Sequence, residues 1–394
     1  MNDSNRAQSK LEGRLMGHVR DLTRIGIRFA GTAGERQAAE RIESFFRGLG
    51  LVVRRQEFPC LSFNFQLCEL EGLENGRWRK IPAYPAAHSP SAPSGGIEAG
   101  LTPIEKIPAD GRWQDDLASR AALVCTSELY DFGKFCSLMQ ANPSALLIVD
   151  DRLPFDWTVA VGFPRAWVDR IHCPVLNVPY AAAWEMIRNG VDRVRLRLQA
   201  EVKEAKSENV IADLAGAGSE ELTIVSAHHD SVLNNPGADD NCSGVAVMLE
   251  LARHFSGNPP HSGLRFISFG TEEQLSEGAR HYLLHEPDLS RIRFALNNDA
   301  MGGWMGRTEI YCTGPEELKV FVEKVCRETG FPGHPVIELS PFSDHFPLNL
   351  AGIPSAWYYR KTFAAARHFH HSREETDEVV SPSVLARTLL HQIA

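Results

Sequence analysis

One stretch of the sequence, SAHHDSVLNNPGADDNCSG at 226–244, gathers residue types that bind metal ions or move protons. It contains two adjacent histidines and three aspartates, together with several asparagines. It directly follows the apolar run LTIV at 222–225, which predicts a buried strand, while its proline and glycines predict a loop. Imidazoles and carboxylates placed just after a strand are typical of a ligand-binding loop at the edge of a sheet.

Three later apolar runs are followed by side chains of the same kinds. In an α/β protein the carboxyl ends of parallel strands meet at one edge of the sheet, so we expect these side chains to converge. Converging carboxylates repel one another strongly unless a cation neutralises them, and a mixture of histidine and carboxylate suits zinc. The sequence therefore predicts a metal site. The runs lie at 264–270, 293–298 and 356–360, and the side chains after them are Glu272 and Glu273, Asp299, and His370 and His371.

The elements that must position these residues alternate along the second half of the chain. Strand-like segments are separated by helix-like segments of roughly ten residues or more, which is typical of a mixed, mostly parallel sheet with helices on both faces. We therefore expect an α/β fold. The expected strands span 222–227, 264–270, 293–299, 308–312 and 354–360, and the expected helices span 244–255, 277–285, 315–330 and the segment from about 382.

The first part of the chain contains a helical pattern from Leu11, a loop at 31–37, a helix at 38–50 and a strand at 51–58. Between about 61 and 202 the pattern changes to short strands broken by turns, which predicts a small inserted α/β module. We therefore expect three segments: 1–60 as the first part of the main domain, 61–202 as the insert, and 203–394 as the rest of the main domain.

Composition and charge limit the partners of the protein. The formal net charge is −9 and no basic run appears, so we expect neither nucleic acid nor an anionic membrane as a partner. The polar N-terminus lacks the apolar segment of a signal peptide, and no run reaches the roughly 18 apolar residues of a membrane span, which favours a cytoplasmic location. The eight cysteines form no CxxC pair, so they predict neither a zinc ribbon nor a disulfide framework.

Taken in order, the motifs resemble those of the co-catalytic di-zinc aminopeptidase family of exopeptidases, whose relatives include bacterial leucyl aminopeptidases, glutamate carboxypeptidase and glutaminyl cyclase. The resemblance covers roughly 11–58 and 205–394, and the region 61–202 is similar to the protease-associated domain inserted in many members. The matching motifs are His228-x-Asp230, GADDNCSG at 237–244, Glu272-Glu273, NND ending at Asp299, SDHFPLNLAGIP from Ser343, and HSREET from His371.

The resemblance implies two zinc ions per chain and a ligand role for each matching position. Two residues depart from the family pattern: Cys242 stands where a glycine or alanine is usual, and Glu375 stands where an aspartate is more usual. Neither departure removes a ligand. The implied ligands are His228 and Asp299 for one zinc, Glu273 and His371 for the second, and Asp240 as a bridge between both.

The resemblance also implies residues that act beside the zinc ions. Glu272 would be the general base and acid, and Asp230 would accept the second N–H of the His228 imidazole and fix its tautomer. His370 stands where the family often has an aromatic hydroxyl that stabilises the oxyanion, and an imidazole can donate a hydrogen bond there. His345 would lie near the site.

The chemistry implied by such a site is peptide hydrolysis. Two zinc ions about 3.5 to 4 Å apart can bind one hydroxide between them and polarise the scissile carbonyl. The glutamate that binds neither ion can then carry the proton to the leaving amine. Negative charge around the site favours a substrate ammonium group, so we expect peptide substrates that are cleaved at a free N-terminus.

Three other functions are compatible with the same motifs. Basic residues near the ligand loops are consistent with a carboxypeptidase, and a glutaminyl-cyclase-like enzyme with one zinc is a further alternative. A non-catalytic binding protein on this scaffold is disfavoured because every ligand position and Glu272 hold competent residues. The zinc content of the protein distinguishes these functions, because a di-zinc peptidase binds two ions, a glutaminyl-cyclase-like enzyme one and a non-catalytic protein none. The sequence does not indicate the oligomeric state. The basic residues are Arg280, Arg360, Lys361, Arg367 and Arg373.

Overall fold

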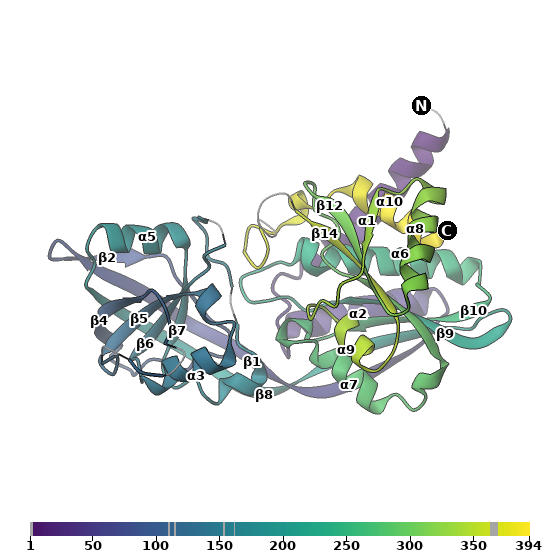
Figure 1. The fold of residues 1–394 in the computed structure, drawn as a ribbon. Helices are drawn as coiled ribbons and strands as arrows, with labels where there is room; N and C mark the ends of the chain where they lie inside the picture. The colour runs from purple at the N-terminus through teal and green to yellow at the C-terminus, as the bar shows by residue number, and fades with distance from the viewer. Residues whose placement is uncertain (1–2, 109–110, 114–115, 153, 161, 363–368) are drawn as a thin grey trace. The chain divides into compact units, whose positions relative to one another are not determined.

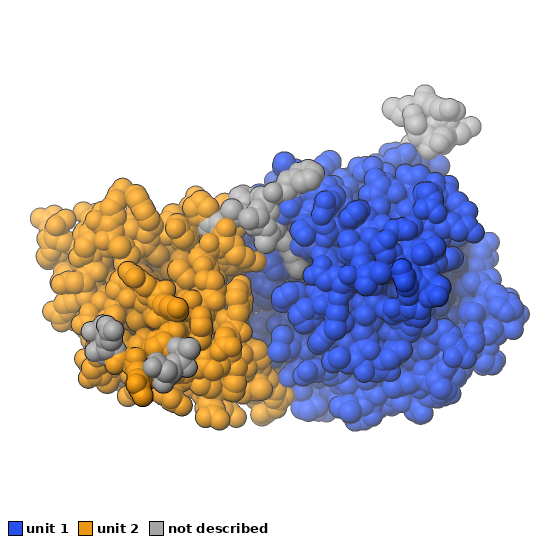
Figure 2. All heavy atoms as spheres, viewed as in Figure 1, with its two compact units in different colours: residues 1–60, 205–394 blue, residues 61–204 orange. Residues whose placement is uncertain are grey.

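The computed structural model describes residues 3–108, 111–113, 116–152, 154–160, 162–362 and 369–394. The chain divides into two compact units, which Figure 2 colours separately. The first unit contains Met1–Cys60 and Ala205–Ala394, and the second contains Leu61–Glu204. The insert expected from the sequence spans 61–202. Its relation to protease-associated domains stays a prediction.

The first unit is built on a mixed sheet whose central strands are parallel (Figure 1). The strand order is β13-β12-β14-β11-β9-β10-β8. Strand β9 pairs in parallel with β10 and β11, and β11 pairs in parallel with β14, whereas β12 and β8 run antiparallel to β14 and β10. The expected mostly parallel sheet is confirmed. The strands are β8 Arg193–Leu214, β9 Ser219–His228, β10 Ser262–Phe269, β11 Ile292–Asn298, β12 Arg307–Thr313, β13 Gly333–Val336 and β14 Ser355–Lys361.

Helices cover both faces of this sheet, as expected. Val225 and Ala227 of β9 lie in one hydrophobic core with residues of α1, α2, α6, α8 and α10, whereas Ile224 lies in another with residues of α7 and α9. Successive side chains of a strand point to opposite faces, so these two cores lie on opposite sides. No helix in the described part of the chain is long and apolar enough to cross a membrane. The helices are α1 Asp3–Thr23, α2 Ala33–Gly48, α6 Gly244–Gly257, α7 Glu277–His285, α8 Glu316–Thr329, α9 His345–Leu350 and α10 Pro382–Ile393.

Helix α2 begins at Ala33 rather than at 38, so the expected loop is wrong over most of its length. Thr32 caps the helix, because its side-chain oxygen accepts a hydrogen bond from Glu35 N. The Glu35 carboxylate reaches back and accepts a hydrogen bond of 2.6 Å from Gly31 N. A threonine followed three residues later by a glutamate is the pattern of a capping box, and it starts the helix earlier than the apolar periodicity does.

Two long strands, β1 Val52–Glu74 and β8, each contain a boundary between the units. The expectation of a strand ending at 58 and of only short strands up to 202 is wrong here. Much of β8 is exposed, including the polar segment EVKE at 201–204. The two strands pair with each other. The first part of β8, at 193–199, does alternate between exposed and buried residues, but the exposed segment EVKE that continues the strand has no such pattern. Main-chain pairing can extend a strand through residues that lack apolar periodicity.

The second unit contains a mixed sheet with the strand order β8-β4-β5-β6-β7-β3. Strands β4 to β7 pair in parallel, and β3 pairs antiparallel with β7. Leu123 and Leu147 lie in one core of this unit, and their neighbours Val124 and Ile148 lie in the other. The elements are β2 Arg77–Ile81, which pairs with β1, β3 Tyr84–Pro85, β4 Ile97–Ile104, β5 Arg120–Cys125, α3 Phe132–Gln140, β6 Ala145–Val149, α4 Arg165–Val168, β7 Val175–Val178 and α5 Tyr180–Arg188.

Candidate metal centre

The loops with the predicted ligands leave four neighbouring parallel strands at one edge of the sheet. His228 is the last residue of β9, which lies between β10 and β11. Glu272 follows β10, Asp299 follows β11, and His371 comes after β14. The carboxyl ends of these strands adjoin because the strands are parallel neighbours. This arrangement brings together side chains that are far apart in the sequence.

Three buried side chains form a first set of donors. His228 Nε2 lies 3.0 Å from Asp240 Oδ1 and 3.5 Å from Asp299 Oδ1. One ligand atom from each residue lies within 4.8 Å of the others, close enough to hold one metal ion. The side chains are between 1% and 6% exposed, so an ion bound here would be almost enclosed. One histidine and two carboxylates form a donor set that suits zinc.

Glu273 and His371 form a second set with the same aspartate. His371 Nε2 is 3.1 Å from Glu273 Oε2 and 3.7 Å from Asp240 Oδ2. The two oxygens of Asp240 therefore face different histidines, Oδ1 toward His228 and Oδ2 toward His371. This is the geometry that a carboxylate bridging two ions needs. The His371 side chain is 23% exposed, so the second set is less enclosed than the first.

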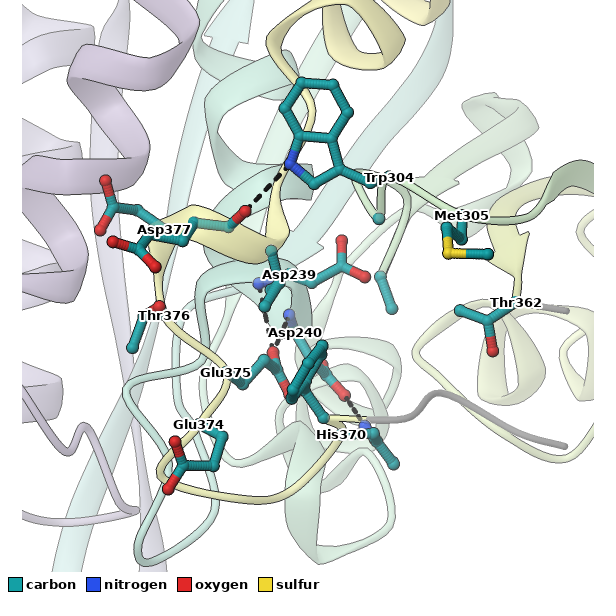
Figure 3. A pocket seen from close by; sticks show the side chains of 15 residues that line it. Asp239, Asp240, Trp304, Met305, Thr362, His370, Glu374, Glu375, Thr376 and Asp377 are labelled. Carbon is teal, nitrogen blue, oxygen red and sulfur yellow. Dashed lines mark hydrogen bonds and ion pairs between the residues drawn. The ribbon is translucent and has the colours of Figure 1, made fainter. Parts of the chain in front are cut away.

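His370 contacts the carboxylate that is predicted to bridge. Its Nδ1 lies 3.0 Å from Asp240 Oδ2, a contact that Figure 3 draws, and its ring centroid lies 3.5 Å from that of His371. Among the described residues, Asp240 and the two histidines form a group whose ligand atoms are close enough for a metal ion, whereas Glu273 is grouped in this way with His228 and Glu272. His370 is thus also placed as an alternative donor. Its role at an oxyanion stays a prediction.

The electrostatics of the cluster favour a bound cation. Burial lowers the pKa of His228, but the Glu272 charge and hydrogen bonds to neighbouring aspartates outweigh it and hold that pKa well above its usual value. Burial raises the pKa of Asp240, but contacts with three histidines hold it well below its usual value. The raised pKa values of His228 and His371 mean that these imidazoles favour their protonated forms beside the carboxylates. A metal ion would displace these protons and supply the positive charge instead.

Several buried oxygens at the centre make no hydrogen bond in the described part of the chain. They are Glu273 Oε1, Asp299 Oδ1 and both carboxylate oxygens of Asp344. Buried polar atoms nearly always have partners, so acceptors grouped around one place indicate a site arranged for a ligand. Their chemistry, imidazole and carboxylate, fits zinc.

Glu272 lies beside both donor sets. Its Oε2 is 3.8 Å from His228 Nε2, and its Oε1 accepts a hydrogen bond of 3.4 Å from Ser276 Oγ. Burial, together with the nearby carboxylates of Asp344 and Asp299, holds the pKa of Glu272 well above its usual value despite the attraction of His228. A raised pKa is the property that a carboxyl group needs in order to act as a general acid or base. It also lies close enough to His228 and Glu273 to bind metal, so its role as general base stays a prediction.

Asp230 supports the glutamates more firmly than it supports the histidine. Its carboxylate accepts hydrogen bonds from Glu272 N at 3.0 Å and from Glu273 N at 3.2 Å. His228 Nδ1 lies 3.4 Å from Asp230 Oδ1, which is long for a hydrogen bond. Asp230 therefore joins the loop after β9 to the loop after β10. The sequence suggested its link to the imidazole but gave no sign of its bonds to the main chain.

The site loops contain strained backbone. Non-glycine residues rarely adopt a left-handed conformation, which costs about 1–3 kcal/mol each and is concentrated at functional sites. Four such residues lie at or directly beside candidate site residues: Thr271 with φ 57°, Ala300 with φ 49°, Ser343 with φ 77° and His371 with φ 59°. The loops are therefore held in conformations that the surrounding fold imposes.

His345 is buried close to the site but is absent from the possible donor groups found among the described residues. Its ring stacks on Trp357 with centroids 4.8 Å apart, and burial lowers its pKa to about 3, so it is neutral. The preceding residue, Asp344, interacts electrostatically with the cluster, including His228 and Glu272. Asp344 belongs to the motif SDHFPLNLAGIP, so that motif could have indicated it.

Glu375 is a further residue that the sequence did not assign to the site. Its Oε1 accepts hydrogen bonds from Asp239 N at 3.1 Å and from Asp240 N at 2.6 Å. Its Oε2 accepts one of 3.3 Å from His371 N. Glu375 therefore ties the main chain of the candidate bridging ligand to that of the last ligand. The only signal in the sequence is its place in the segment HSREET.

A cavity of about 940 Å³ opens beside the centre (Figure 3). Asp240, Ala300 and His370 reach it from the metal centre, and Trp304, Met305 and Phe369 contribute apolar surface. Trp304 Nε1 donates a hydrogen bond to Glu378 O, which fixes the indole at the rim. The described lining contains several carboxylates and no lysine or arginine. The cavity thus offers apolar walls and a negative potential next to the candidate ligands.

Comparisons with known proteins show what the chain is similar to. Residues 209–392 match the model of peptidase family M28. Aminopeptidase YwaD of Bacillus subtilis is 29% identical over 372 residues, which are 91% of this chain and 78% of that protein. The probable lipoprotein aminopeptidase LpqL of Mycobacterium tuberculosis is 28% identical over 86% of this chain and 72% of its own. The structure of BSAP, a zinc aminopeptidase from Bacillus subtilis, aligns with a TM-score of 0.77 at 26% identity over 96% of this chain and 93% of that one.

The fold and the centre are those of a metallopeptidase. Its sheet is mixed and covered by helices, and the candidate metal ligands lie at the carboxyl ends of the parallel strands. The part of the chain that carries the centre matches the model of peptidase family M28, and the similarity to zinc aminopeptidases extends over most of the chain. The predictions of the fold class, of a zinc aminopeptidase family and of a hydrolytic enzyme are confirmed. Zinc is the metal that these similarities imply. The number of ions, the residues that bind them and the cytoplasmic location stay predictions.

Proposed function

We propose that the protein is an aminopeptidase that uses two zinc ions to hydrolyse the first peptide bond of its substrates. The observation that carries the proposal is the pair of donor sets that share Asp240, with Glu272 beside both. The match of residues 209–392 to the model of family M28 and the similarity to zinc aminopeptidases support it. His228 and Asp299 would hold one ion, and Glu273 and His371 would hold the other.

Two zinc ions, when bound, supply an activated water molecule and polarise the scissile carbonyl. Glu272 would take the proton of that water and deliver it to the leaving amine, a task that suits a carboxyl group with a raised pKa. Asp230 would keep Glu272 in place, because it accepts a hydrogen bond from Glu272 N. His370 would stand at the side of the cavity, within reach of a substrate carbonyl.

The cavity beside the centre would take the first residue of the substrate. Its apolar surface at Trp304, Met305 and Phe369 suits a large side chain. Its carboxylates and the carboxylates of the centre attract the α-ammonium group of a free N-terminus and repel an anionic side chain. A free amine and a non-acidic first residue are therefore the substrate features that the charge distribution favours.

The carboxypeptidase alternative would need basic side chains that are available to a substrate carboxylate. Arg360 instead donates to Gly303 O and to Thr308 Oγ1, and Lys361 lies 3.6 Å from Glu309. Arg373 pairs with Glu374 at 2.9 Å, and Arg367 lies outside the described residues. These pairings disfavour Arg360, Lys361 and Arg373 as a site for a substrate carboxylate, and Arg280 is exposed on α7. The second donor set disfavours a one-zinc enzyme, and Glu272 disfavours a non-catalytic protein.

The test compares an aminoacyl p-nitroanilide with its N-acetylated form, using protein loaded with zinc. We expect hydrolysis of the free-amine substrate and at least about a hundredfold slower hydrolysis of the acetylated one, because acetylation removes the ammonium charge. Equal rates on the two substrates would contradict aminopeptidase activity. Cleavage of a C-terminal residue from an N-blocked peptide would establish the carboxypeptidase alternative.

A further inference from the structure

The loop between the candidate ligands His228 and Asp240 is held from the N-terminal part of the chain. Arg28 lies shortly before α2, outside the segment 209–392 that matches the family model. Its side chain is 0% exposed, which is rare for an arginine. A fully buried guanidinium must have its donors satisfied, and its partners identify what it does.

The partners of the Arg28 guanidinium are main-chain carbonyls, and most of them belong to that loop. Nε donates to His229 O at 2.8 Å, Nη1 to Pro236 O at 2.6 Å, and Nη2 to Gly237 O at 3.2 Å. Nη1 also donates to Gly26 O at 3.2 Å. Within the described residues no carboxylate forms an ion pair with it. The loop itself therefore solvates the buried charge.

Two further contacts fix the loop against Arg28. Arg28 N donates to Ser231 Oγ at 3.0 Å, and Ser231 N donates to Arg28 O at 3.2 Å. Gly237 has φ 59°, and a Cβ atom there would lie 2.4 Å from Asp240 O and 2.7 Å from Arg28 Nη2. The approach is so close that only glycine fits. The loop is thus packed directly between the arginine and the main chain of Asp240.

Glu375 holds the same loop through its N–H groups. It accepts hydrogen bonds from Asp240 N at 2.6 Å, from Asp239 N at 3.1 Å and from Asn235 Nδ2 at 3.2 Å. The loop therefore lies between a buried cation that binds its carbonyls and a buried glutamate side chain that binds its amides. Hydrogen bonds to a charged group such as the guanidinium are roughly twice as strong as neutral ones. The bonds to Glu375 add to them, so both contacts stiffen the segment that ends in Asp240.

We propose that Arg28 is a positioning residue of the metal centre, which acts with Glu375 to fix the main chain of Asp240. A carboxylate that bridges two ions must be held within about 0.5 Å of its productive position, and a loop containing proline and glycine does not provide that by itself. Arg28 is not one of the candidate metal ligands, and within the described residues the hydrogen-bond partners of its guanidinium are main-chain carbonyls. This inference rests on the proposed metal centre and adds a residue that the family segment does not contain.

The test measures zinc binding to the full chain, with Arg28→Met, Arg28→Lys and Glu375→Gln compared with the wild type. Zinc affinity is determined by competition with a chromophoric chelator, and kcat and KM are measured at saturating zinc. Removing a residue that orients a metal ligand typically costs about 10–100-fold in affinity, so we expect that loss in Arg28→Met. Arg28→Lys keeps the positive charge but loses the planar guanidinium, so its zinc affinity should lie between those of the wild type and Arg28→Met. In these variants kcat should fall by a larger factor than KM changes.

Arg265→Met is the matched control. Arg265 is also buried, at 7% exposed, but it pairs with Asp213 on the neighbouring strand rather than with a ligand loop. The substitution Arg265→Met should lower the free energy of unfolding and leave the zinc affinity unchanged. The proposal is overturned if Arg28→Met behaves in the same way. If Arg28→Met does not fold, unchanged zinc affinity in Arg28→Lys and Glu375→Gln overturns it equally. Wild-type protein that binds no zinc would contradict the metal centre itself, and this role with it.

Discussion

The two donor sets around Asp240 are supported in different ways. In the first set, His228 ends β9 and Asp299 directly follows β11, so both ligands stand on hydrogen-bonded strands. Their side chains are 1% and 6% exposed. In the second set, His371 lies in a loop well after β14 and is 23% exposed. Glu273 follows a left-handed Thr271.

The comparison indicates that two donor sets with the same kinds of ligand can be held with different rigidity. A ligand at the end of a central strand is already ordered before an ion binds, whereas a loop ligand must be ordered by the ion or by other residues. We therefore expect the first set to bind zinc more tightly than the second. Residues such as Glu375 and Asp230, which fix loop amides, reduce that difference.

The largest effect should come from Asp240, which both sets share. Asp240→Ala should lose both zinc ions and reduce hydrolysis to the background rate, because each set would keep only two of its ligands. Metal analysis after gel filtration measures this loss. Asp239→Asn is the control, since Asp239 accepts a hydrogen bond from Gly302 N and is not a proposed ligand. Undiminished zinc in Asp240→Ala would mean that the sets do not share this residue.

The next effect separates the two adjacent glutamates. Glu272→Gln should keep both ions and lose at least about a hundredfold in kcat, the usual scale for a general acid or base. Glu273→Gln should instead lose zinc from the second set, because its Oε2 lies 3.1 Å from His371 Nε2. Zinc content and kcat are measured on the same preparations. The reverse pattern would exchange the roles of the two residues.

Stepwise zinc removal tests the difference in rigidity directly. A chelator titration of the wild type should release one ion at least about tenfold more readily than the other. His371→Ala should keep the tightly bound ion, whereas His228→Ala should lose it. Release is followed by competition with an indicator dye. Two ions with equal affinity, or a tighter ion lost in His371→Ala, would contradict the comparison.

A smaller effect concerns Glu35, which lies beneath the loop that carries Glu272 and Glu273. It accepts hydrogen bonds from Ser207 Oγ at 2.6 Å and from Thr271 Oγ1 at 3.5 Å. Burial, reinforced by the charge of Asp230, raises the pKa of Glu35 from 4.5 to about 8. The fold prefers the protonated form, so this contribution to stability is complete below pH 4.5 and is lost as the pH rises through 8.

A substitution that removes the titrating group tests this dependence of stability on pH. Glu35→Gln cannot lose a proton, so its free energy of unfolding should rise relative to the wild type between pH 5 and pH 9. Urea unfolding of both proteins at these two pH values measures the difference. A constant difference across this range would show that Glu35 is charged in the folded protein. Glu35→Ala, which also removes the capping box of α2, should be less stable than Glu35→Gln at both pH values.

The sequence was informative where chemistry follows an apolar strand. His228, Glu272, Glu273 and Asp299 could be selected because each follows a strand-like run and has a side chain that binds metal or protons. The parallel alternation of strands and helices then predicted that they meet. The same reasoning predicted the main sheet and the helices on both of its faces.

Residues that act through the main chain could not be selected in this way. Arg28 and Glu375 contact backbone atoms of a loop that is more than 100 residues from either in the sequence, and such contacts leave no periodic pattern. Asp344 is buried and was hidden in a motif read for its histidine. The full length of strands β1 and β8 could not be predicted, because pairing of the main chain continues each strand through exposed polar segments such as 201–204.

The most direct test of the central claim is anomalous diffraction from crystals grown with zinc. The account predicts two zinc peaks about 3.5 to 4 Å apart, one on each side of the Asp240 carboxylate. One peak should lie beside His228 and Asp299, and the other beside Glu273 and His371. A single peak, or two peaks that do not share Asp240, would contradict the account.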